Sequence, residues 1–243
     1  MNTYLGVITT KPPGKVISKI VARINANFKI VVFVNSSCDK LVAEWLAYAD
    51  AIPLISVIHG DKFFQAGYSR NRILAHISSN EKNSVYRLWL LDDDMLPSLL
   101  SLEHLLKLDK PGIFIPKRRE IVNGKRISFD FFKSKLNAGG VKFRPGGSLI
   151  LVKTFDVQPF PENVKCEEES IWSLRNYISN GHMPKLINTI SFTHFGRTNQ
   201  IKKVSRKIGA PYFFLMFYLV KASFVRGFNR DILYAAKQIF KII

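Results

Sequence analysis

Three consecutive aspartates follow a short apolar run, in the segment Arg87-Leu-Trp-Leu-Leu-Asp-Asp-Asp-Met-Leu-Pro97. Adjacent carboxylates repel one another, so a fold keeps Asp92, Asp93 and Asp94 together most readily when a cation offsets their charge. Hard oxygen ligands of this kind suit Mg2+ or Mn2+, and either ion can bridge to a diphosphate. The alternative is a solvated turn that caps a helix beginning at Pro97, since Asp and Pro are ordinary residues there.

The elements around these aspartates have the pattern of an α/β protein. Short β-rich apolar runs alternate with helical patterns through the first half of the chain, which is typical of a βαβ sheet. Ligands bind such sheets at the carboxyl ends of the strands, where the aspartates are expected to lie. The predicted strands span residues 4–8, 28–34, 52–58, 86–91, 112–115, 127–132 and 148–152. The predicted helices span residues 15–25, 39–49, 68–78 and 167–179.

Composition narrows the class of protein. The 243 residues, 47% of them hydrophobic, can bury one sizeable α/β core. A net charge of +18, from 36 basic and 18 acidic residues, predicts a polyanionic partner such as nucleic acid, anionic lipid or a phosphorylated substrate. Cys38 and Cys166 lie far apart and lack C-x-x-C spacing, so neither a disulfide framework nor a zinc module is indicated, and a reducing compartment fits best.

Membrane and export signals are not expected from the sequence. Lys11 and Pro12 interrupt the N-terminal apolar stretch before a secretory core develops, so we predict no signal peptide. The most apolar stretch, 210–220, is shorter than the ~20 residues that a spanning helix needs.

The aspartate segment resembles the D-x-D motif of the family-2 glycosyltransferases, which follows an apolar strand and precedes a proline-containing helix start. The resemblance implies a GT-A fold, a Rossmann-like mixed sheet that binds a nucleotide-diphospho-sugar. It also implies that Asp92 faces the nucleotide and that Asp94 holds the metal. Asp93 is the variable middle position of the motif, on the substrate side.

Two further segments match the family in the expected order. Gly67-Tyr-Ser-Arg-Asn71 opens a helix before the aspartates, and its resemblance places Arg70 near the diphosphate; the alternative is a surface arginine at a helix start. Arg144-Pro-Gly-Gly-Ser148 is similar to a glycine pair that lines the acceptor side of the cleft, and implies that Gly147 contacts substrate. A tight turn uses the same residues.

The resemblance also suggests a base and a second metal ligand. The segment Pro159-Phe-Pro-Glu-Asn-Val-Lys-Cys-Glu-Glu-Glu-Ser-Ile-Trp-Ser-Leu-Arg175 resembles the family's E-D motif, which makes Glu168 and Glu169 the acidic pair and Glu169 the base that deprotonates the acceptor. The alternative is a helix start that carries acids because the macrodipole favours them. His194 stands where related enzymes often complete the metal site, although a lone histidine is more often structural.

Two departures from the family fall where the nucleotide base is usually read. After the first strand the chain has Thr9-Thr-Lys-Pro-Pro13, and after the second it has Asn35-Ser-Ser-Cys-Asp39. We expect Thr9 and Asn35 to contact the donor, but the identity of the nucleotide stays open.

The last fifth of the chain differs in composition from the rest. Asp231 is the only acidic residue from Gly196 onward, so we divide the chain into a glycosyltransferase domain, 1–195, and a basic amphipathic helical segment, 196–243. Arg226, Arg230, Lys237 and Lys241 fall within about 60° of one another on a helical projection, with the apolar residues Phe228, Ile232, Ala235 and Ile239 opposite. Such a helix binds an anionic membrane surface, or docks on the domain with its basic face solvated.

The sequence therefore predicts a metal-dependent glycosyltransferase that uses Mn2+ or Mg2+ and a nucleotide-sugar donor. The expected acceptor is a glycan or a lipid-linked glycan of cell-surface polysaccharide or lipopolysaccharide synthesis, glycosylated with inversion. We expect a cytoplasmic enzyme held peripherally on the inner face of the plasma membrane. Two rivals remain: a nucleic-acid-binding protein, which the charge favours although the carboxylates would repel phosphates, and a metal-dependent nucleotidyl or phosphoryl transferase.

Overall fold

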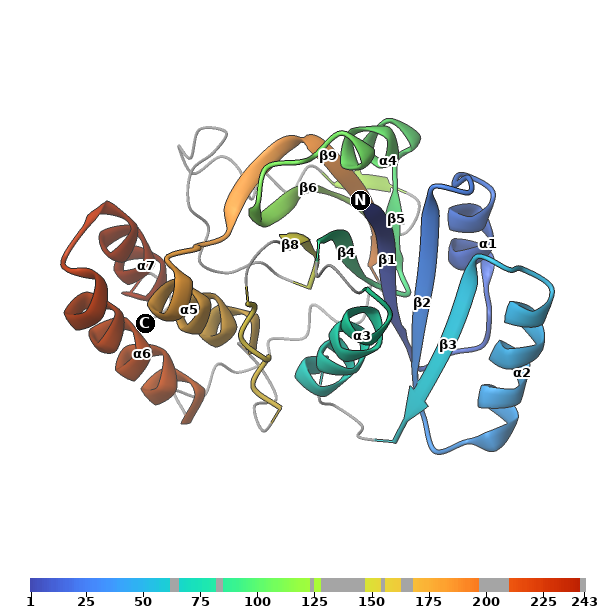
Figure 1. Cartoon of the computed structure of the whole chain (residues 1–243), viewed down its shortest axis with the longest axis horizontal. Helices are drawn as coiled ribbons and strands as arrows, with labels where there is room; N and C mark the ends of the chain where they lie inside the picture. Colours follow the sequence, from blue (N-terminus) through green and yellow to red (C-terminus); the bar gives the residue numbers. More distant parts are fainter. Residues whose placement is uncertain are drawn as a thin grey trace.

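The computed structural model describes residues 1–61, 66–81, 85–122, 125–127, 147–153, 156–162, 168–196 and 210–240. Nine strands of these residues form one mixed sheet in the order β3-β2-β1-β4-β8-β6-β9-β5, with β7 paired to β6. β1, β2, β3 and β4 run parallel, whereas β8 is antiparallel to both β4 and β6. The pairing of neighbouring strands therefore changes from parallel to antiparallel after β4, which lies in the middle of the sheet (Figure 1).

The first half of the chain is a series of βα units. Its apolar β-branched runs form strands, and the runs with apolar residues three and four apart form the crossover helices. The elements are β1 (Asn2–Thr9), α1 (Lys15–Val21), β2 (Phe28–Asn35), α2 (Asp39–Asp50), β3 (Ile55–Gly60), α3 (Ala66–Asn80) and β4 (Tyr86–Asp92).

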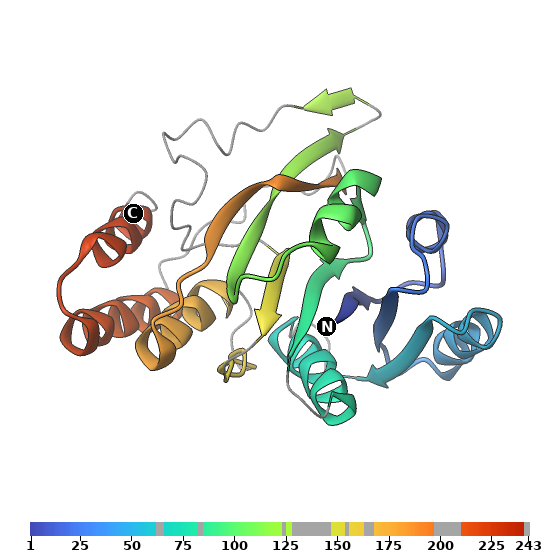
Figure 2. The same cartoon turned by 45° about the horizontal axis from the view of Figure 1, so that its top comes forward.

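The second half extends the sheet and adds helices at one end. Figures 1 and 2 show α5, α6 and α7 together at the end of the molecule opposite β3 and α2. The elements are β5 (Met95–Pro97), α4 (Leu99–Leu106), β6 (Gly112–Val122), β7 (Lys125–Ile127), β8 (Leu149–Lys153), α5 (Glu168–Asn180), β9 (Lys185–Gly196), α6 (Ala210–Arg226) and α7 (Arg230–Phe240).

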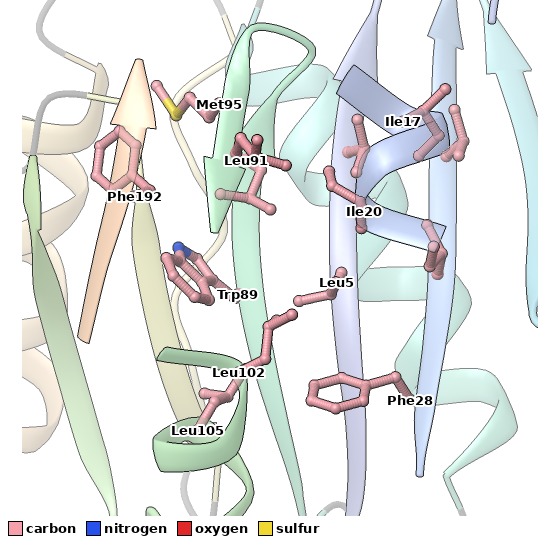
Figure 3. Packing of buried hydrophobic residues seen from close by; sticks show 14 of the residues in the cluster. Leu5, Ile17, Ile20, Phe28, Trp89, Leu91, Met95, Leu102, Leu105 and Phe192 are labelled. Carbon is pink, nitrogen blue, oxygen red and sulfur yellow. The ribbon is translucent and has the colours of Figure 1, made fainter. Parts of the chain in front are cut away.

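Two apolar clusters hold the sheet between its helices. Alternation along β4 sends Trp89 and Leu91 to one face, where they meet α1, α2 and α4, and sends Leu88 and Leu90 to the other face, where they meet α3 and α5. Figure 3 shows the first cluster, in which the indole of Trp89 lies between β4 and β9. A sheet buried on both faces fixes the strand ends firmly, and these ends carry the candidate site.

The predicted strands and helices correspond to elements of the structure whose ends differ by up to four residues, as for α1, which ends at Val21 rather than at residue 25. Three further differences concern single segments. Pro97 does not begin a helix: it ends β5, and α4 begins at Leu99 after the N-cap Ser98, whose hydroxyl accepts a hydrogen bond from Ser101 N. The strand expected at 112–115 continues to Val122 because β9 pairs with it along its length. Of the strand expected at 127–132, only residue 127 falls within the described residues.

The C-terminal helices pack on the rest of the protein. Leu215, Leu219 and Ala222 of α6 are buried in one cluster with residues of α5, and α7 adds Ile232 and Ala235. Within the described ranges, no helix combines the length and apolarity needed to cross a membrane. The division of the chain after residue 195 stays a prediction.

Candidate active site

The three aspartates form the connection between β4 and β5. Asp92 is the last residue of β4 and lies beside Ile8 of β1, while Met95 begins β5. This connection stands at the carboxyl end of the parallel strands, at the point where the sheet changes from parallel to antiparallel neighbours. Open α/β sheets bind their ligands at such an edge.

Asp94 and His194 meet because β5 and β9 are paired. Met95 lies opposite His194 in the antiparallel register, and Phe195 N donates a hydrogen bond to Asp94 O at 2.9 Å. His194 Nε2 therefore lies 3.4 Å from Asp94 Oδ2. Burial alone would raise the pKa of Asp94, but the hydrogen bond from His194 and the charge of Lys11 hold that pKa below its ordinary value.

The contact at the second ring nitrogen of His194 determines the direction of its hydrogen bond with Asp94. Arg118 approaches His194 Nδ1 at 2.9 Å. Because a guanidinium only donates, Nδ1 accepts and the proton of the neutral ring sits on Nε2, facing Asp94. In this arrangement His194 orients Asp94. To bind a cation through Nε2, the ring would have to carry its proton on Nδ1, and Arg118 would have to move away from that nitrogen.

Asp92 is a carboxylate held in low-dielectric surroundings. Burial raises its pKa to about 6, and the charges of Asp94, Glu169 and Asp93 add to this rise while Arg70 opposes it. Gly147 lies against it: a Cβ built on Gly147, whose φ is +85°, would stand 3.0 Å from Asp92 Oδ2. The glycine therefore leaves room for the carboxylate, in a backbone conformation that favours glycine.

Arg70 joins α3 to the acidic start of α5. Its side chain is only 2% exposed, and its two terminal nitrogens donate to Glu168 Oε1 and to Glu169 Oε1, each at 2.8 Å. Burial would lower the pKa of Arg70, but the charges of Glu169, Asp92 and Glu168 raise it above its ordinary value. Burial and the charge of Glu169 raise the pKa of Glu168, against the effect of Arg70.

The other residues of the Gly67-to-Asn71 segment hold the chain that leads to α5. Asn71 Nδ2 donates to Phe160 O at 2.9 Å and to Glu162 Oε1 at 2.8 Å, while its Oδ1 accepts from Phe160 N at 2.7 Å. Gly67 permits this contact, because an added Cβ would stand 2.3 Å from Pro161 O. Sequence reasoning named neither Gly67 nor Asn71 as a site residue, although both belong to the segment that carried the resemblance.

Thr9 and Asp93 lie on the β1 side of the connection. Thr9 Oγ1 donates to Asp93 Oδ2 at 2.9 Å, and Lys11 Nζ pairs with Asp93 Oδ1 at 2.5 Å. These three residues border a hollow of about 140 Å3 whose wall is completed by apolar residues of α1 and by Trp45. Lys11 was not predicted; the signal was its place in the stretch after the first strand that departs from the family.

Asn35 lies at the end of β2, where its amide is buried. Its Nδ2 donates to Ser69 Oγ at 3.3 Å, next to Arg70 in the first turns of α3. Asn35 therefore stands on the same edge of the sheet as Thr9 and Asp92, and it contacts α3.

Together these contacts gather the predicted residues into one acidic site. Five carboxylates, Asp92 to Asp94 with Glu168 and Glu169, face Arg70 and Lys11 as cations. Asp94 Oδ1 is buried and has no hydrogen-bond partner among the described residues. Also within that part of the chain, no three His, Cys, Asp or Glu side chains are grouped to hold one metal ion. A cation here would have Asp94 as a protein ligand, and His194 could join it only as the other tautomer.

The chain is similar to solved structures at low sequence identity. No protein-family model and no curated protein matches it. The structure of S. aureus TarS aligns with 99% of this chain at a TM-score of 0.61 and 14% identity. The mannosyltransferase PcManGT from Pyrobaculum calidifontis, in complex with GDP-Man and Mn2+, aligns with 98% at 0.60 and 14% identity. GalNAc-T7 with UDP, GalNAc and Mn2+ aligns with 90% at 0.54 and 11% identity.

This chain has the GT-A glycosyltransferase fold. It spans 42% of the TarS chain, 47% of the GalNAc-T7 chain and 69% of the PcManGT chain. In the GT-A fold of this protein, the acidic site lies at the carboxyl edge of the parallel strands, as the sequence predicts.

Proposed function

We propose that this protein is a metal-dependent glycosyltransferase that moves a sugar from a nucleotide-sugar donor to a glycan or lipid-linked acceptor, with inversion. The pathway we propose is the synthesis of cell-surface polysaccharide or lipopolysaccharide. The observation that carries this is the five-carboxylate site at the sheet edge of a GT-A fold. The donors named with two of the similar structures, UDP with GalNAc and GDP-Man, are nucleotide sugars or their parts.

The metal role falls to Asp94, with His194 beside it. The buried and unpaired Asp94 Oδ1 fits a cation, because a buried carboxylate oxygen without a donor is costly. Mg2+ and Mn2+ are commonly bound by one or two protein ligands together with water and phosphate oxygens, so a small protein ligand set is sufficient. A bound ion would neutralise the charge that develops on the leaving diphosphate.

Asp92 and its neighbours are suited to hold the donor. Asp92 can accept hydrogen bonds from a ribose, while Gly147 leaves space at its carboxylate. Thr9, Asn35 and Asp93 stand on the same edge, toward the ends of β1 and β2, and we place the nucleoside there.

Glu169 is the proposed base, and Arg70 positions it. The ion pair occupies Glu169 Oε1, and Glu169 is more exposed than Glu168. A base in this place would take the proton of the acceptor hydroxyl as that oxygen attacks the anomeric carbon. Arg70 then acts through the two glutamates rather than as a free contact to the diphosphate.

The acidity of this site weighs against nucleic acid as the ligand of the site. Phosphates approaching five carboxylates would be repelled unless a cation lay between them. We therefore assign the positive charge of the protein to another surface and not to this edge of the sheet.

A thermal-shift panel tests the proposal. Nucleotide sugars with Mn2+ are compared with plain nucleotides, with nucleotide sugars in EDTA and with oligonucleotides. We expect the largest rise in the unfolding midpoint with one nucleotide sugar and Mn2+. Equal stabilisation by nucleoside triphosphate and Mn2+, with release of pyrophosphate, would support a nucleotidyl transferase instead.

A further inference from the structure

Helix α6 has two apolar faces, of which one packs against α5 and α7 and the other is exposed in the described part of the chain. Leu215, Leu219 and Ala222 are buried against α5 and α7. The opposite face carries the aromatic side chains with the highest exposed fractions among the described residues: Phe213 is 83% exposed and Phe224 is 85% exposed.

The exposed residues form a continuous ridge along the helix. At 100° per residue, Phe213, Phe217, Val220 and Phe224 fall within an arc of about 60°, on the side opposite the buried residues. We call these four residues the α6 ridge. It extends over most of a helix of 17 residues, and Phe228, 73% exposed, lies just beyond its end.

Exposed Lys221 flanks this ridge on α6, and other basic residues are close to it in the sequence. Lys221, Arg226 and Arg230 are exposed, and the segment from Gly196 onward carries ten lysines and arginines against the single acid Asp231. Exposed aromatic rings beside unbalanced positive charge are complementary to a surface that is apolar inside and anionic outside.

We propose that the α6 ridge inserts its phenylalanine rings into the interface of an anionic lipid bilayer, with α6 lying along the surface. A ridge on one helix is convex, and acyl chains yield to a convex shape, whereas a protein partner would need a matching groove. Exposed Lys221 and the excess of lysine and arginine in this part of the sequence add an attraction to anionic headgroups that such a groove would not require.

Membrane binding by the α6 ridge deepens the proposed function, and it rests on that function for the lipid-linked acceptor. Helix α5 has Glu168 and Glu169 in its first turn, and α6 packs against the same helix. Arg226 Nε donates to Tyr177 O at 3.0 Å and to Ile178 O at 3.1 Å, which ties the end of α6 to the end of α5. A bilayer held by α6 would thus be fixed relative to the helix that carries the proposed base.

The proposed lipid-binding surface lies on a different helix from the one that the sequence indicates. Sequence reasoning places Ile232 and Ala235 on the lipid side of a basic helix, but both are buried in the cluster with α5 and α6. For these two residues the docked-helix alternative is correct, and the free apolar face belongs to α6.

Flotation of the full-length protein with vesicles tests this proposal. Vesicles of phosphatidylcholine alone are compared with vesicles that also contain phosphatidylglycerol, at low and high salt. The variant Phe213→Ser/Phe217→Ser/Phe224→Ser removes the ridge, and Leu46→Ser/Leu99→Ser/Leu100→Ser is the matched control, since it removes exposed leucines from α2 and α4.

We expect the wild-type chain to bind the anionic vesicles and to bind less as salt rises, because screening shortens from ~10 Å at 0.1 M to ~3 Å at 1 M. The ridge variant should lose at least ~tenfold in vesicle affinity, while the leucine variant keeps it. A blue-shifted emission of Phe217→Trp on anionic vesicles would place the ring in the interface, because the three native tryptophans are buried.

Three results would overturn the proposal: wild-type protein that ignores anionic vesicles at low salt, a ridge variant that binds as the wild type does, or ridge-dependent dimers in place of vesicle binding. Sugar transfer to a soluble acceptor is measured on the same samples. Ridge-dependent vesicle binding without any sugar transfer would support the ridge and count against the proposed function, which separates the two.

Discussion

At the scale of single residues, Arg70 controls how much negative charge the site can hold. Its guanidinium is buried, pairs with both glutamates of α5, and lies within electrostatic reach of Asp92. Without a buried cation, Asp92 and the two glutamates would repel one another in a low-dielectric environment. The arginine therefore holds together the donor side and the base side of the proposed site.

The two glutamates are expected to differ in function. Glu169→Gln keeps an oxygen for Arg70 but cannot take a proton, so turnover should fall by roughly 10² to 10⁴ while donor affinity is retained. Steady-state transfer kinetics, with donor binding measured separately, check this result. Glu168→Gln is the matched control, because it alters the more buried glutamate of the same pair. The loss of turnover in Glu168→Gln instead would move the base by one residue.

The types and the order of the site residues could be predicted, but not their pairing. Asp92 to Asp94 follow an apolar strand and Glu168 with Glu169 begin a helix, so both are visible as local patterns. The Arg70 ion pairs join residues 98 and 99 positions apart, and Lys11 and Asp93 are 82 positions apart. Such contacts depend on the register of the sheet and on loop paths, which short-range patterns do not contain.

At the scale of elements, the start of α3 positions the start of α5. Asn71 forms hydrogen bonds with the backbone of Phe160, and Gly67 lies close to the carbonyl oxygen of Pro161. The ring of Phe160 stacks on Trp172 of α5 with centroids 4.4 Å apart. A short extended segment is thereby held between two helices, and the glutamates are fixed opposite Arg70.

Gly67→Ala should disturb this junction. The added Cβ would meet a backbone oxygen at 2.3 Å, so α3 or the Pro161 segment must shift, at a cost of about 1–3 kcal/mol. Chemical denaturation checks the loss of stability. Gly14→Ala is the comparison, because its Cβ would meet nothing nearer than 3.8 Å. Equal stability of Gly67→Ala and the wild type would mean that the close approach to Pro161 is not structurally important.

The main strands and helices were predictable because their apolar periodicity is strong, whereas β5 was not. Its three residues, Met95 to Pro97, are too short to show a period, and Pro97 is an ordinary residue at a helix start. What makes them a strand is pairing with β9, nearly a hundred residues later. The same pairing brings His194 to Asp94, so the metal proposal depends on an element that the sequence alone does not reveal.

At the scale of the whole molecule, an acidic site lies in a strongly basic protein. The chain carries a net charge of +18, yet five carboxylates gather at one edge of the sheet. Much of the positive charge lies in the last fifth of the sequence, which contains α6 and α7. The division of charge suggests two tasks, cation and donor binding at the site and surface attachment at the C-terminal helices.

Removing residues after Phe195 should destabilise the remaining domain. The truncation would expose Ile171, Leu174 and Tyr177 of α5, which pack against α6 and α7. We expect a lower unfolding midpoint and aggregation, followed by differential scanning fluorimetry and light scattering. A truncated chain that unfolds at the wild-type temperature would support an independent C-terminal segment.

The central claim is that sugar transfer depends on a divalent cation held at Asp94. The most direct measurement follows transfer from a nucleotide sugar to an acceptor by mass spectrometry, for the wild type with Mn2+, the wild type with EDTA, Asp94→Ala with Mn2+, and the exposed-site control Asp50→Ala with Mn2+. Transfer should occur only with Mn2+ and only in the wild type and the Asp50 variant, because loss of Asp94 leaves the diphosphate charge uncompensated. Asp94→Ala that remains folded and transfers sugar at the wild-type rate would contradict the claim.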